Sequence, residues 1–565
     1  MSSYSERSSL LTSREYGRTR FDYTFQLPNY FIQAFERELA KLELSSLTNS
    51  EIIEYDGRFE VAQEKMLDEN CLKKLAFFKD IVIKRDNIED RLIPDQLLLE
   101  KLTPVIRRSK NEHDVSRLIN SLDTLQVGRK ESQYLTHSLH PYKGRFYPQM
   151  IRALINLARL KAGNTVLDPF CGCGTTLLEC FLTDINSIGI DLHPLACFIA
   201  KVKIQSLNLN PAKLRSEIKK LLRRIQADNM RLQKLTLDSF LLLPQEISDL
   251  PSLPDMPNID KWFSPDVLVK IQVIMKNIDK IEDENVKDLF KVVLSRILKS
   301  ISNWDTRQVR VRLLKEPRKN VPVFEIFEDK LWKSYFIILS YQKIKPKLSI
   351  SGDADTKVIN ADSRRLEFVD SESIDAIITS PPYAMALPYI DTDRLSLFML
   401  GYVNRKTIND LIFQMIGNRE ISDEVRKKWE REFLEKYDEL AFPVYFKKTL
   451  NKMIQENKEL PNTAFRRKNM PALLFKYFYD MQLCLNEMDR VLKSDKHCVI
   501  VVGNNYTTTG KGNVVNIETD RVLSDMAVSN GWSLIKRIVK GLTPTSPPPL
   551  SKIRYESVLI FRKNR

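Results

Sequence analysis

The chain has 565 residues, 43% hydrophobic and 28% charged, a composition typical of a soluble globular protein with more than one domain. Its net charge of +15 favours a polyanionic partner such as nucleic acid, although a basic solvated surface is the simpler alternative. No apolar run is long enough to span a bilayer, the N-terminus lacks the apolar core of a secretory signal, and the seven cysteines form neither a zinc pattern nor a disulfide framework, which fits a reducing cytosol.

The N-terminal region is expected to be helical, with helices near Tyr30–Leu44 and Glu60–Lys84. A clearer helix starts at Pro148, where apolar residues recur at helical spacing, and Gly163 lies where a C-cap is expected. A short strand is predicted at Asn164–Leu167. No motif with a chemical role stands out before about Lys130.

Strands and helices then alternate for two units. A helix is predicted at Thr175–Phe181 and a second strand at Asn186–Ile190, which ends at Asp191. The order of helix, strand, helix and strand predicts a parallel α/β sheet.

Charged helical segments interrupt this alternation twice. The pattern is helical from about Pro194 to Lys347 and again over about Asn404–Asn469. A further amphipathic helix is predicted at Lys476–Leu492. The remaining strands are predicted at Thr356–Ile359, Ile374–Thr379, His497–Val502, Ser533–Val539 and Ser557–Phe561.

The segment Asp168-Pro169-Phe170-Cys171-Gly172-Cys173-Gly174-Thr175-Thr176 follows the first of these strands. Glycines after a strand let the backbone approach a ligand, but the spacing is that of neither a dinucleotide fingerprint nor a P-loop. An acid at the end of the second strand, Asp191, commonly binds ribose hydroxyls. Asp362 follows the third strand and is placed to contact an adenine amino group. Each feature alone is more often a turn or a helix cap; their order along one sheet favours a nucleotide-like cofactor.

The tetrapeptide Ser380-Pro381-Pro382-Tyr383 closes the apolar strand Ile374–Thr379. It is a rigid turn in the simplest interpretation. Its place after a buried strand and downstream of the glycine loop favours a functional loop instead.

Together, these motifs resemble those of the S-adenosylmethionine-dependent DNA amino-methyltransferases. The segment His140–Gln149 also resembles the family motif that packs on the methionine end of the cofactor, and Arg554–Ile560 resembles the last strand. The resemblance covers roughly residues 135–195 and 357–565, in pieces. It implies a Rossmann-like methyltransferase sheet, α/β and mostly parallel with seven strands, carrying helical insertions and a helical N-terminal region.

The resemblance also implies roles for single residues and S-adenosylmethionine as the cofactor. Phe170, Gly172 and Gly174 are expected to contact the methionine part, Asp191 the ribose and Asp362 the adenine. The full set of expected cofactor-binding residues is Asp168, Phe170, Gly172, Gly174, Thr175, Asp191, Asp362, Tyr147 and Pro148.

Six segments follow from these expectations. They are a helical N-terminal region (1–130), the cofactor-binding half of the methyltransferase domain (131–200), a helical insertion that is a candidate for target recognition (201–347), the acceptor half (348–403), a second helical insertion (404–470) and the C-terminal part of the sheet (471–565).

The chemistry of amino methylation explains the tetrapeptide, whose four residues Ser380, Pro381, Pro382 and Tyr383 are the expected catalytic set. An exocyclic amino group is a poor nucleophile, because its lone pair is delocalised into the ring. The Ser380 hydroxyl and the Pro381 carbonyl can accept its N–H groups, and Tyr383 offers a face for base stacking. Since the sulfonium methyl is already activated, alignment supplies most of the rate, and we expect no metal and no cysteine nucleophile.

The first residue of the tetrapeptide distinguishes between acceptors in this family. Ser is commoner with cytosine N4, and Asp or Asn with adenine N6, so Ser380 favours cytosine. Adenine N6, an RNA base amino group and a DNA-binding protein without turnover remain alternatives. A base in duplex DNA would have to be flipped out to reach the loop.

Recognition of DNA is expected from the insertions. Basic clusters can neutralise phosphates, and arginines can contact guanine edges, although a solvated helix face is an equal alternative for any one cluster. The candidate DNA-binding residues are Arg307, Arg310, Arg312, Lys319, Arg466 and Arg467. The expected setting is the cytoplasm of a prokaryotic cell, with double-stranded DNA as partner and, within a restriction-modification or defence system, a separately encoded restriction endonuclease.

Overall fold

The computed structural model of the chain describes residues 21–30, 32–55, 57–85, 88–125, 131, 133–238, 249–306, 311–384, 389–418, 421–459, 465–509, 511–541 and 555–565.

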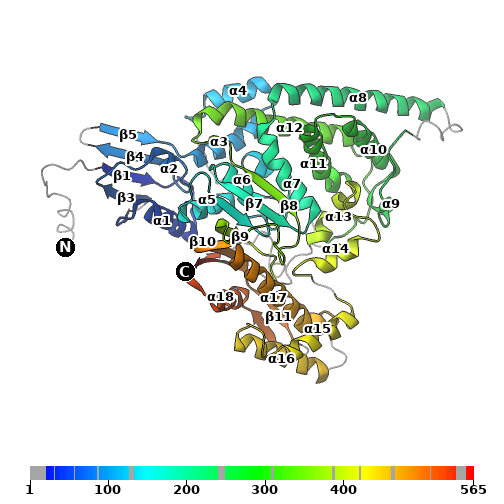
Figure 1. Cartoon of the computed structure of the whole chain (residues 1–565). Coiled ribbons are helices and arrows are strands. Elements are labelled where there is room, and N and C mark those ends of the chain that lie inside the picture. The colour runs from blue at the N-terminus through cyan, green and yellow to red at the C-terminus, as the bar shows by residue number, and fades with distance from the viewer. Residues whose placement is uncertain are drawn as a thin grey trace, which may run out of the picture.

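A seven-stranded sheet in the order β13-β14-β10-β9-β6-β7-β8 forms the centre of the molecule (Figure 1). Its strands are β6 (Thr165–Asp168), β7 (Asn186–Asp191), β8 (Thr356–Asn360), β9 (Ile374–Thr379), β10 (Leu492–Gly503), β13 (Trp532–Gly541) and β14 (Tyr555–Lys563). β14 is antiparallel to both of its neighbours, and the other pairs in this sheet are parallel. The predicted Rossmann-like, mostly parallel sheet is confirmed.

The strands β6 and β9 lie side by side at the centre of this sheet. Val166 pairs with Ala376 and Leu167 with Ile377. All six residues of β9 are buried, as in a strand covered on both faces. The chain leaves β6 toward β7 on one side and leaves β9 toward β10 on the other, so a topological switch point lies between them. In such sheets ligands bind outside the carboxyl ends of the strands at this point.

Alternate residues of the strands pack on opposite faces of the sheet. Val166 and Ala376 belong to a core shared with α5 and the N-terminal region. Leu167 and Ile377 belong to a second core shared with α17 and α18. The helices concerned are α5 (Pro148–Leu157), α17 (Phe465–Val491) and α18 (Thr519–Ser529).

The prediction of a helical N-terminal region is correct only in part: α1 (Ala34–Thr48) overlaps the predicted helix Tyr30–Leu44, but the region also contains an antiparallel sheet. This sheet has five strands in the order β2-β3-β1-β4-β5, at the blue end of Figure 1. The predicted helix at Glu60–Lys84 is instead strand, short helix and strand, because Phe59 and Val61 alternate with more exposed residues and Ile81–Ile83 is a β-branched run. The elements are β1 (Phe21–Gln26), α1 (Ala34–Thr48), β2 (Ile53–Tyr55), β3 (Arg58–Gln63), α2 (Glu69–Lys73), β4 (Asp80–Arg85), β5 (Ile88–Leu92), α3 (Asp95–Arg108) and α4 (Glu112–Asn120).

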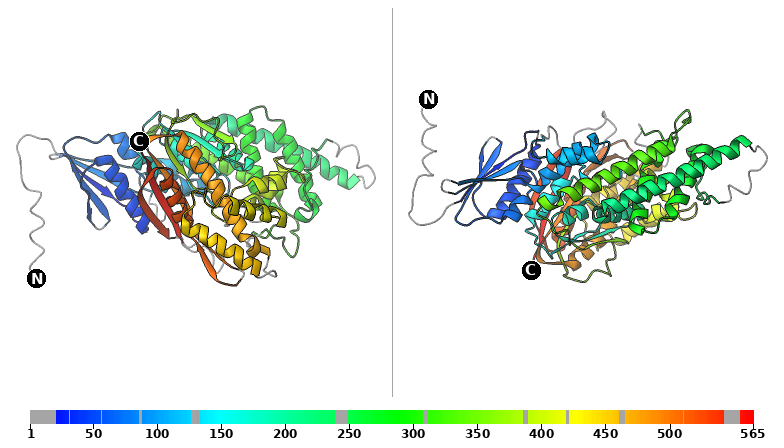
Figure 2. Two further views of the ribbon diagram at one scale, coloured as in Figure 1. Left: turned by 60° about the horizontal axis from the view of Figure 1, so that its bottom comes forward. Right: turned by 90° about the horizontal axis from the view of Figure 1, so that it is seen from above.

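Helices follow β7 and β9. Of those after β7, α9 (Ile259–Trp262) and α10 (Pro265–Asp279) lie at the end of the molecule opposite the N-terminal sheet (Figures 1 and 2). After α6 (Thr175–Phe181) and β7 come α7 (Pro194–Gln205), α8 (Pro211–Asp238), α9 (Ile259–Trp262), α10 (Pro265–Asp279), α11 (Glu284–Ile301) and α12 (Val323–Ile344). After β9 come α13 (Tyr389–Met399), α14 (Ile408–Gln414), α15 (Asp423–Glu435) and α16 (Val444–Glu459). A hairpin of β11 (Asn505–Thr508) and β12 (Val514–Ile517) was not predicted. Among the described helices, none combines the length and the hydropathy needed to cross a membrane.

Candidate functional site

The two sequence motifs meet at the carboxyl edge of the sheet. β6 ends at Asp168 and β9 at Thr379, and the Thr379 hydroxyl donates a hydrogen bond to Asp168 Oδ1 at 2.6 Å. Both side chains are buried. The backbone amide of Phe170 donates to the same oxygen at 3.1 Å, and the Phe170 ring packs against the core formed with α17. The glycine loop and the Ser380–Tyr383 loop therefore leave the sheet side by side.

Asp191 at the end of β7 faces the glycine loop. Its Oδ2 accepts from the Gly172 amide at 2.9 Å and its Oδ1 from the His193 amide at 2.8 Å. Gly172 has a φ of +48°, and a Cβ there would lie 3.3 Å from the ring of Tyr142. The glycine thus lets Tyr142 lie directly on the loop. Each carboxylate oxygen keeps a further lone pair, so a ribose contact by Asp191 stays a prediction.

Gly174 is constrained by packing. It precedes α6 with a φ of +76°, and a Cβ there would lie 2.7 Å from Cβ of Ala200 in α7. Any side chain would push the start of α6 away from α7. The packing against Ala200 is observed, whereas the expected contact between Gly174 and the methionine part of a cofactor stays a prediction.

We expect Gly174→Ala to lower the free energy of unfolding by about 2 to 4 kcal/mol, from left-handed backbone strain and from the clash with Ala200. Gly163→Ala is the matched control. Gly163 also has a positive φ, but a Cβ there would meet nothing within 4 Å, so only the strain of about 1 to 2 kcal/mol applies. Urea denaturation followed by circular dichroism measures both, and equal losses would contradict the packing role.

A cavity of about 310 Å³ lies between the glycine loop and the segment that precedes α5. It contains three of the expected cofactor-binding residues, Tyr147, Pro148 and Thr175. Its full lining is Gln133, His137, Tyr142, Arg145, Phe146, Tyr147, Pro148 and Thr175. Sequence reasoning missed His137 and Arg145 as lining residues. The signal for Arg145 was its position inside the His140–Gln149 motif; His137, just before that motif, had none.

Asp362 lies beyond the end of β8 and forms an ion pair. Both of its carboxylate oxygens accept from the Arg364 guanidinium, at 2.6 to 3.0 Å. Arg364 also donates to Asp480 of α17 at 2.8 Å and to the carbonyl of Gln414 at 3.1 Å. Burial favours the neutral acid, but these hydrogen bonds and the Arg364 charge outweigh it and lower the pKa of Asp362. The predicted adenine contact would share this carboxylate with Arg364.

The Ser380–Tyr383 loop is held by hydrogen bonds to strands β10 and β14. The Ser380 hydroxyl donates to the backbone carbonyl of Val501 in β10 at 2.8 Å. The Tyr383 hydroxyl donates to Glu556 Oε1 in β14 at 2.7 Å, and Lys540 donates to Oε2 of the same acid at 2.7 Å. Glu556 lies in the C-terminal motif but was not predicted as a site residue. Pro381 is buried and Pro382 partly buried, so the four predicted residues form a rigid, anchored loop.

Asp168 gives the site a pH dependence. Burial raises the pKa of this carboxyl from an ordinary 3.8 to about 6, and the hydrogen bonds it accepts only partly offset the burial. Because folding favours the protonated form, its contribution to stability is complete below about pH 4 and is lost as the pH rises through 6. We expect the stability difference between the wild type and Asp168→Asn to shift by about 2 kcal/mol against the wild type between pH 4 and pH 7. Urea denaturation of both proteins at both pH values measures this shift. A stability difference that stays the same at pH 4 and pH 7 would contradict the raised pKa of Asp168.

The structure describes only part of the basic candidates for DNA binding. Arg312 and Lys319 are exposed between α11 and α12, and Arg467 is exposed near the start of α17. Arg307 and Arg310 lie outside the described residues, and nothing is described of the Arg466 side chain. A role in DNA binding stays a prediction for all six. Across the described residues, no group of three or more His, Cys, Asp or Glu side chains is arranged to hold a metal ion.

Comparisons with known proteins bear on this site. Residues 84–202 match a protein family described as DNA methylase (N6/N4). The chain is 26% identical over 333 residues to the type II methyltransferase M.MjaII of Methanocaldococcus jannaschii, covering 46% of this chain and 62% of that protein. It is 24% identical over 475 residues to the type II methyltransferase M.MvaI of Kocuria varians, covering 82% and 95%. A shorter match, 44% identical over 83 residues, covers 15% of this chain and 23% of the tRNA (guanine(10)-N2)-dimethyltransferase of M. jannaschii.

Proposed function

The chain is a distant member of the N6/N4 DNA methylase family, and from this premise we propose that it transfers a methyl group from S-adenosylmethionine to the N4 amino group of cytosine in duplex DNA. The observation that supports an amino group as the methyl acceptor is the hydrogen bond that Ser380 donates to the Val501 carbonyl, because it leaves the Ser380 oxygen as an acceptor for N–H groups. Of the three relatives named above, the two matched over the longest stretches are type II methyltransferases, which supports a restriction-modification setting.

The residues at the edge of the sheet fit S-adenosylmethionine. The cofactor combines an adenosine with a zwitterionic amino acid and a sulfonium. Asp191 is an acceptor for ribose hydroxyls, and the aromatic rings of Tyr142, Phe146 and Tyr147 in the cavity suit a cationic group. When bound, the cofactor supplies a methyl group activated by the sulfonium. The chain holds and aligns the reactants and excludes water.

Ser380 prepares the acceptor. Its single hydroxyl proton is engaged by the Val501 carbonyl, so its oxygen presents lone pairs and acts toward a ligand as an acceptor. An amino group that donates to this oxygen and to the Pro381 carbonyl is drawn toward tetrahedral geometry, which exposes its lone pair. The hydrogen bond from Tyr383 to Glu556 fixes the ring at its polar end, and we propose that the base stacks on this ring.

The choice of cytosine N4 rests on serine as the first residue of the loop. An adenine amino group offers the same two N–H donors, so adenine N6 is the second candidate. The target base is flipped out of the duplex, at a cost of a few kcal/mol that binding must offset. The net charge of +15 and the exposed Arg312, Lys319 and Arg467 support contacts with phosphates. The proposed setting is a prokaryotic cytoplasm with a separately encoded endonuclease as partner.

A transfer assay tests this function. The purified protein is incubated with labelled S-adenosylmethionine and either duplex DNA or RNA, and the product is digested to nucleosides and separated by chromatography. N4-methylcytosine is the expected product. N6-methyladenine would overturn the choice of base, and label found only in RNA would overturn the choice of DNA. Binding of DNA with no transfer to any acceptor would favour a non-catalytic DNA-binding protein on the same fold.

A further inference from the structure

The hairpin of β11 and β12 leaves the central sheet next to the Ser380–Tyr383 loop. It follows β10 at the carboxyl edge, since β10 runs parallel to β9. The buried Asn505 donates from Nδ2 to the carbonyl of Ala384, the residue after the loop, at 3.1 Å. At the base of the hairpin, Asn504 Nδ2 donates to Asp520 Oδ1 at 2.7 Å, and the Asp520 amide donates back to Asn504 Oδ1 at 3.0 Å. The hairpin is therefore fixed beside the loop on which the flipped base is proposed to bind.

The two faces of the hairpin differ in burial. Neighbouring residues of a strand point to opposite faces, so Ile517 packs into the core with α17 and α18, whereas Val514 and Asn516 are exposed. Their partners across the hairpin, Thr508 and Tyr506, are partly exposed. These last four residues form the outer face of the hairpin. Val514 is 66% exposed, the highest value for a large hydrophobic side chain in the described part of the chain. The outer face combines this apolar group with hydroxyl and amide groups and carries no charge.

The helix α16 lies alongside the hairpin (Figure 1). Lys511 at the tip of the hairpin forms an ion pair with Glu459, the last residue of α16, at 2.7 Å. Arg521, just after the base of the hairpin, lies over the ring of Tyr445 near the start of α16, at 4.2 Å from the ring centroid. The helix and the hairpin are thus in contact at both ends of the helix.

Two exposed lysines of α16 lie between these contacts. Lys448 and Lys452 follow Tyr445 by three and seven residues, and Glu459 follows Lys452 by seven, so all four side chains share one face of the helix. Among the described residues, no carboxylate lies within ion-pair distance of Lys448 or Lys452. Their ammonium groups are therefore available to neutralise phosphates next to the hairpin.

We propose that the outer face of the hairpin enters a groove of the duplex beside the flipped base, while Lys448 and Lys452 contact the adjacent phosphates. The inference rests on the proposed function, since it takes duplex DNA as the substrate. A two-stranded ribbon fits the major groove, where the Asn516 amide and the apolar Val514 can meet base edges. Lysine contacts with phosphates position a protein on the duplex without reading its sequence. Neither lysine, nor any residue of the hairpin, is among the six DNA-binding candidates predicted from the sequence.

The salt dependence of duplex binding tests the two lysines. Fluorescence anisotropy measures the Kd of a labelled duplex, taken from DNA that the protein methylates, over a range of salt concentrations. Each phosphate contact contributes about 0.9 to the slope of log Kd against log salt, so Lys448→Gln with Lys452→Gln should lower this slope by about 1.8. Lys65→Gln with Lys161→Gln is the matched control, because it removes two exposed charges in the N-terminal region and before β6 at the amino edge of the sheet. The control should keep the wild-type slope, and an unchanged slope in the α16 variant would overturn the phosphate contacts.

A charge placed on the outer face tests the hairpin. Val514→Glu should raise the Kd for the duplex about 10-fold or more, because its carboxylate would face the negative duplex. Affinity for S-adenosylhomocysteine should stay at the wild-type value, which shows that the variant is folded. Val528→Glu is the matched control: Val528 is 50% exposed near the end of α18, just before β13 begins at the amino edge, and this variant should bind DNA as the wild type does.

Wild-type affinity of Val514→Glu for the duplex would overturn the placement of the hairpin while leaving the proposed function intact. If the wild type neither binds nor methylates duplex DNA, the proposed function itself fails, which is a different result.

Discussion

Replacing Ser380 by alanine is expected to reduce turnover by about 100-fold, the effect of removing one pre-organised hydrogen-bonding group from a reacting centre. The alanine removes the oxygen that would accept from the base amino group, so the lone pair of that amino group stays delocalised. The glycine loop and the cavity are untouched, so cofactor affinity should stay within about twofold of the wild type. Single-turnover methylation and calorimetric titration with S-adenosylhomocysteine give the two quantities.

The matched control for this variant is Ser373→Ala. Ser373 precedes the opposite end of β9, and its hydroxyl donates to the carbonyl of Asp370. This variant should keep both turnover and cofactor affinity. Equal losses of turnover and affinity in Ser380→Ala would show that Ser380 supports the fold of the site, and the acceptor role would have to be abandoned.

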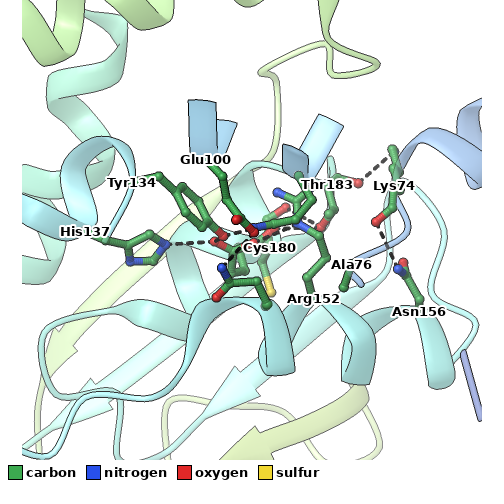
Figure 3. A network of polar contacts seen from close by, with 12 residues as sticks. Lys74, Ala76, Glu100, Tyr134, His137, Arg152, Asn156, Cys180 and Thr183 are labelled. Carbon is green, nitrogen blue, oxygen red and sulfur yellow. Dashed lines mark hydrogen bonds and ion pairs between the residues drawn. The ribbon is translucent and has the colours of Figure 1, made fainter. Parts of the chain in front are cut away.

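Replacing Glu179 by leucine is expected to cost about 3 to 5 kcal/mol of stability, because it leaves the Arg152 guanidinium buried without its partner. Arg152 donates to Glu179 at 2.9 Å, and neither side chain is exposed to solvent. Figure 3 shows Tyr134, His137 and Arg152 converging in this buried network. Burial alone would raise the pKa of Glu179, but the Arg152 charge and the hydrogen bonds from His137 and Tyr134 lower it, so the acid is charged when folded. Urea denaturation at neutral pH measures the loss.

A double replacement distinguishes the buried pair from simple packing. Glu179→Leu with Arg152→Met removes both charges and should recover most of the stability that Glu179→Leu loses. Glu54→Gln, which removes one partner of the exposed ion pair with Arg37, should cost less than about 1 kcal/mol. If the double variant is less stable than Glu179→Leu, the network does not act as a compensated charge pair.

Regular elements near the site could be predicted because their sequence signals are local. The strand Ile374–Thr379 has the predicted bounds, since a mostly apolar run followed closely by two prolines has few other solutions. The N-terminal sheet was mistaken for helices, because short strands such as β3 and β4 show only a few alternating residues. The hairpin of β11 and β12 was missed for the same reason.

The partners of the site residues could not be predicted, because they come from distant parts of the chain. Asp362 was expected to face adenine. Its partner Arg364 also forms an ion pair with Asp480, and this second contact depends on where α17 crosses the sheet. The anchoring of Tyr383 by Glu556 depends on β14 returning beside β10.

The sequence by itself determined the order of strands and motifs, and with it a sheet whose glycine loop precedes an acceptor loop, since strand periodicity and turn residues act over a few neighbours. Only the tertiary structure decided that the Thr379 hydroxyl donates to Asp168, that the Ser380 hydroxyl donates to the Val501 carbonyl, and that Arg145 and His137 line one cavity. These contacts join residues brought together by sheet pairing and helix packing, and no local pattern encodes which distant groups meet there.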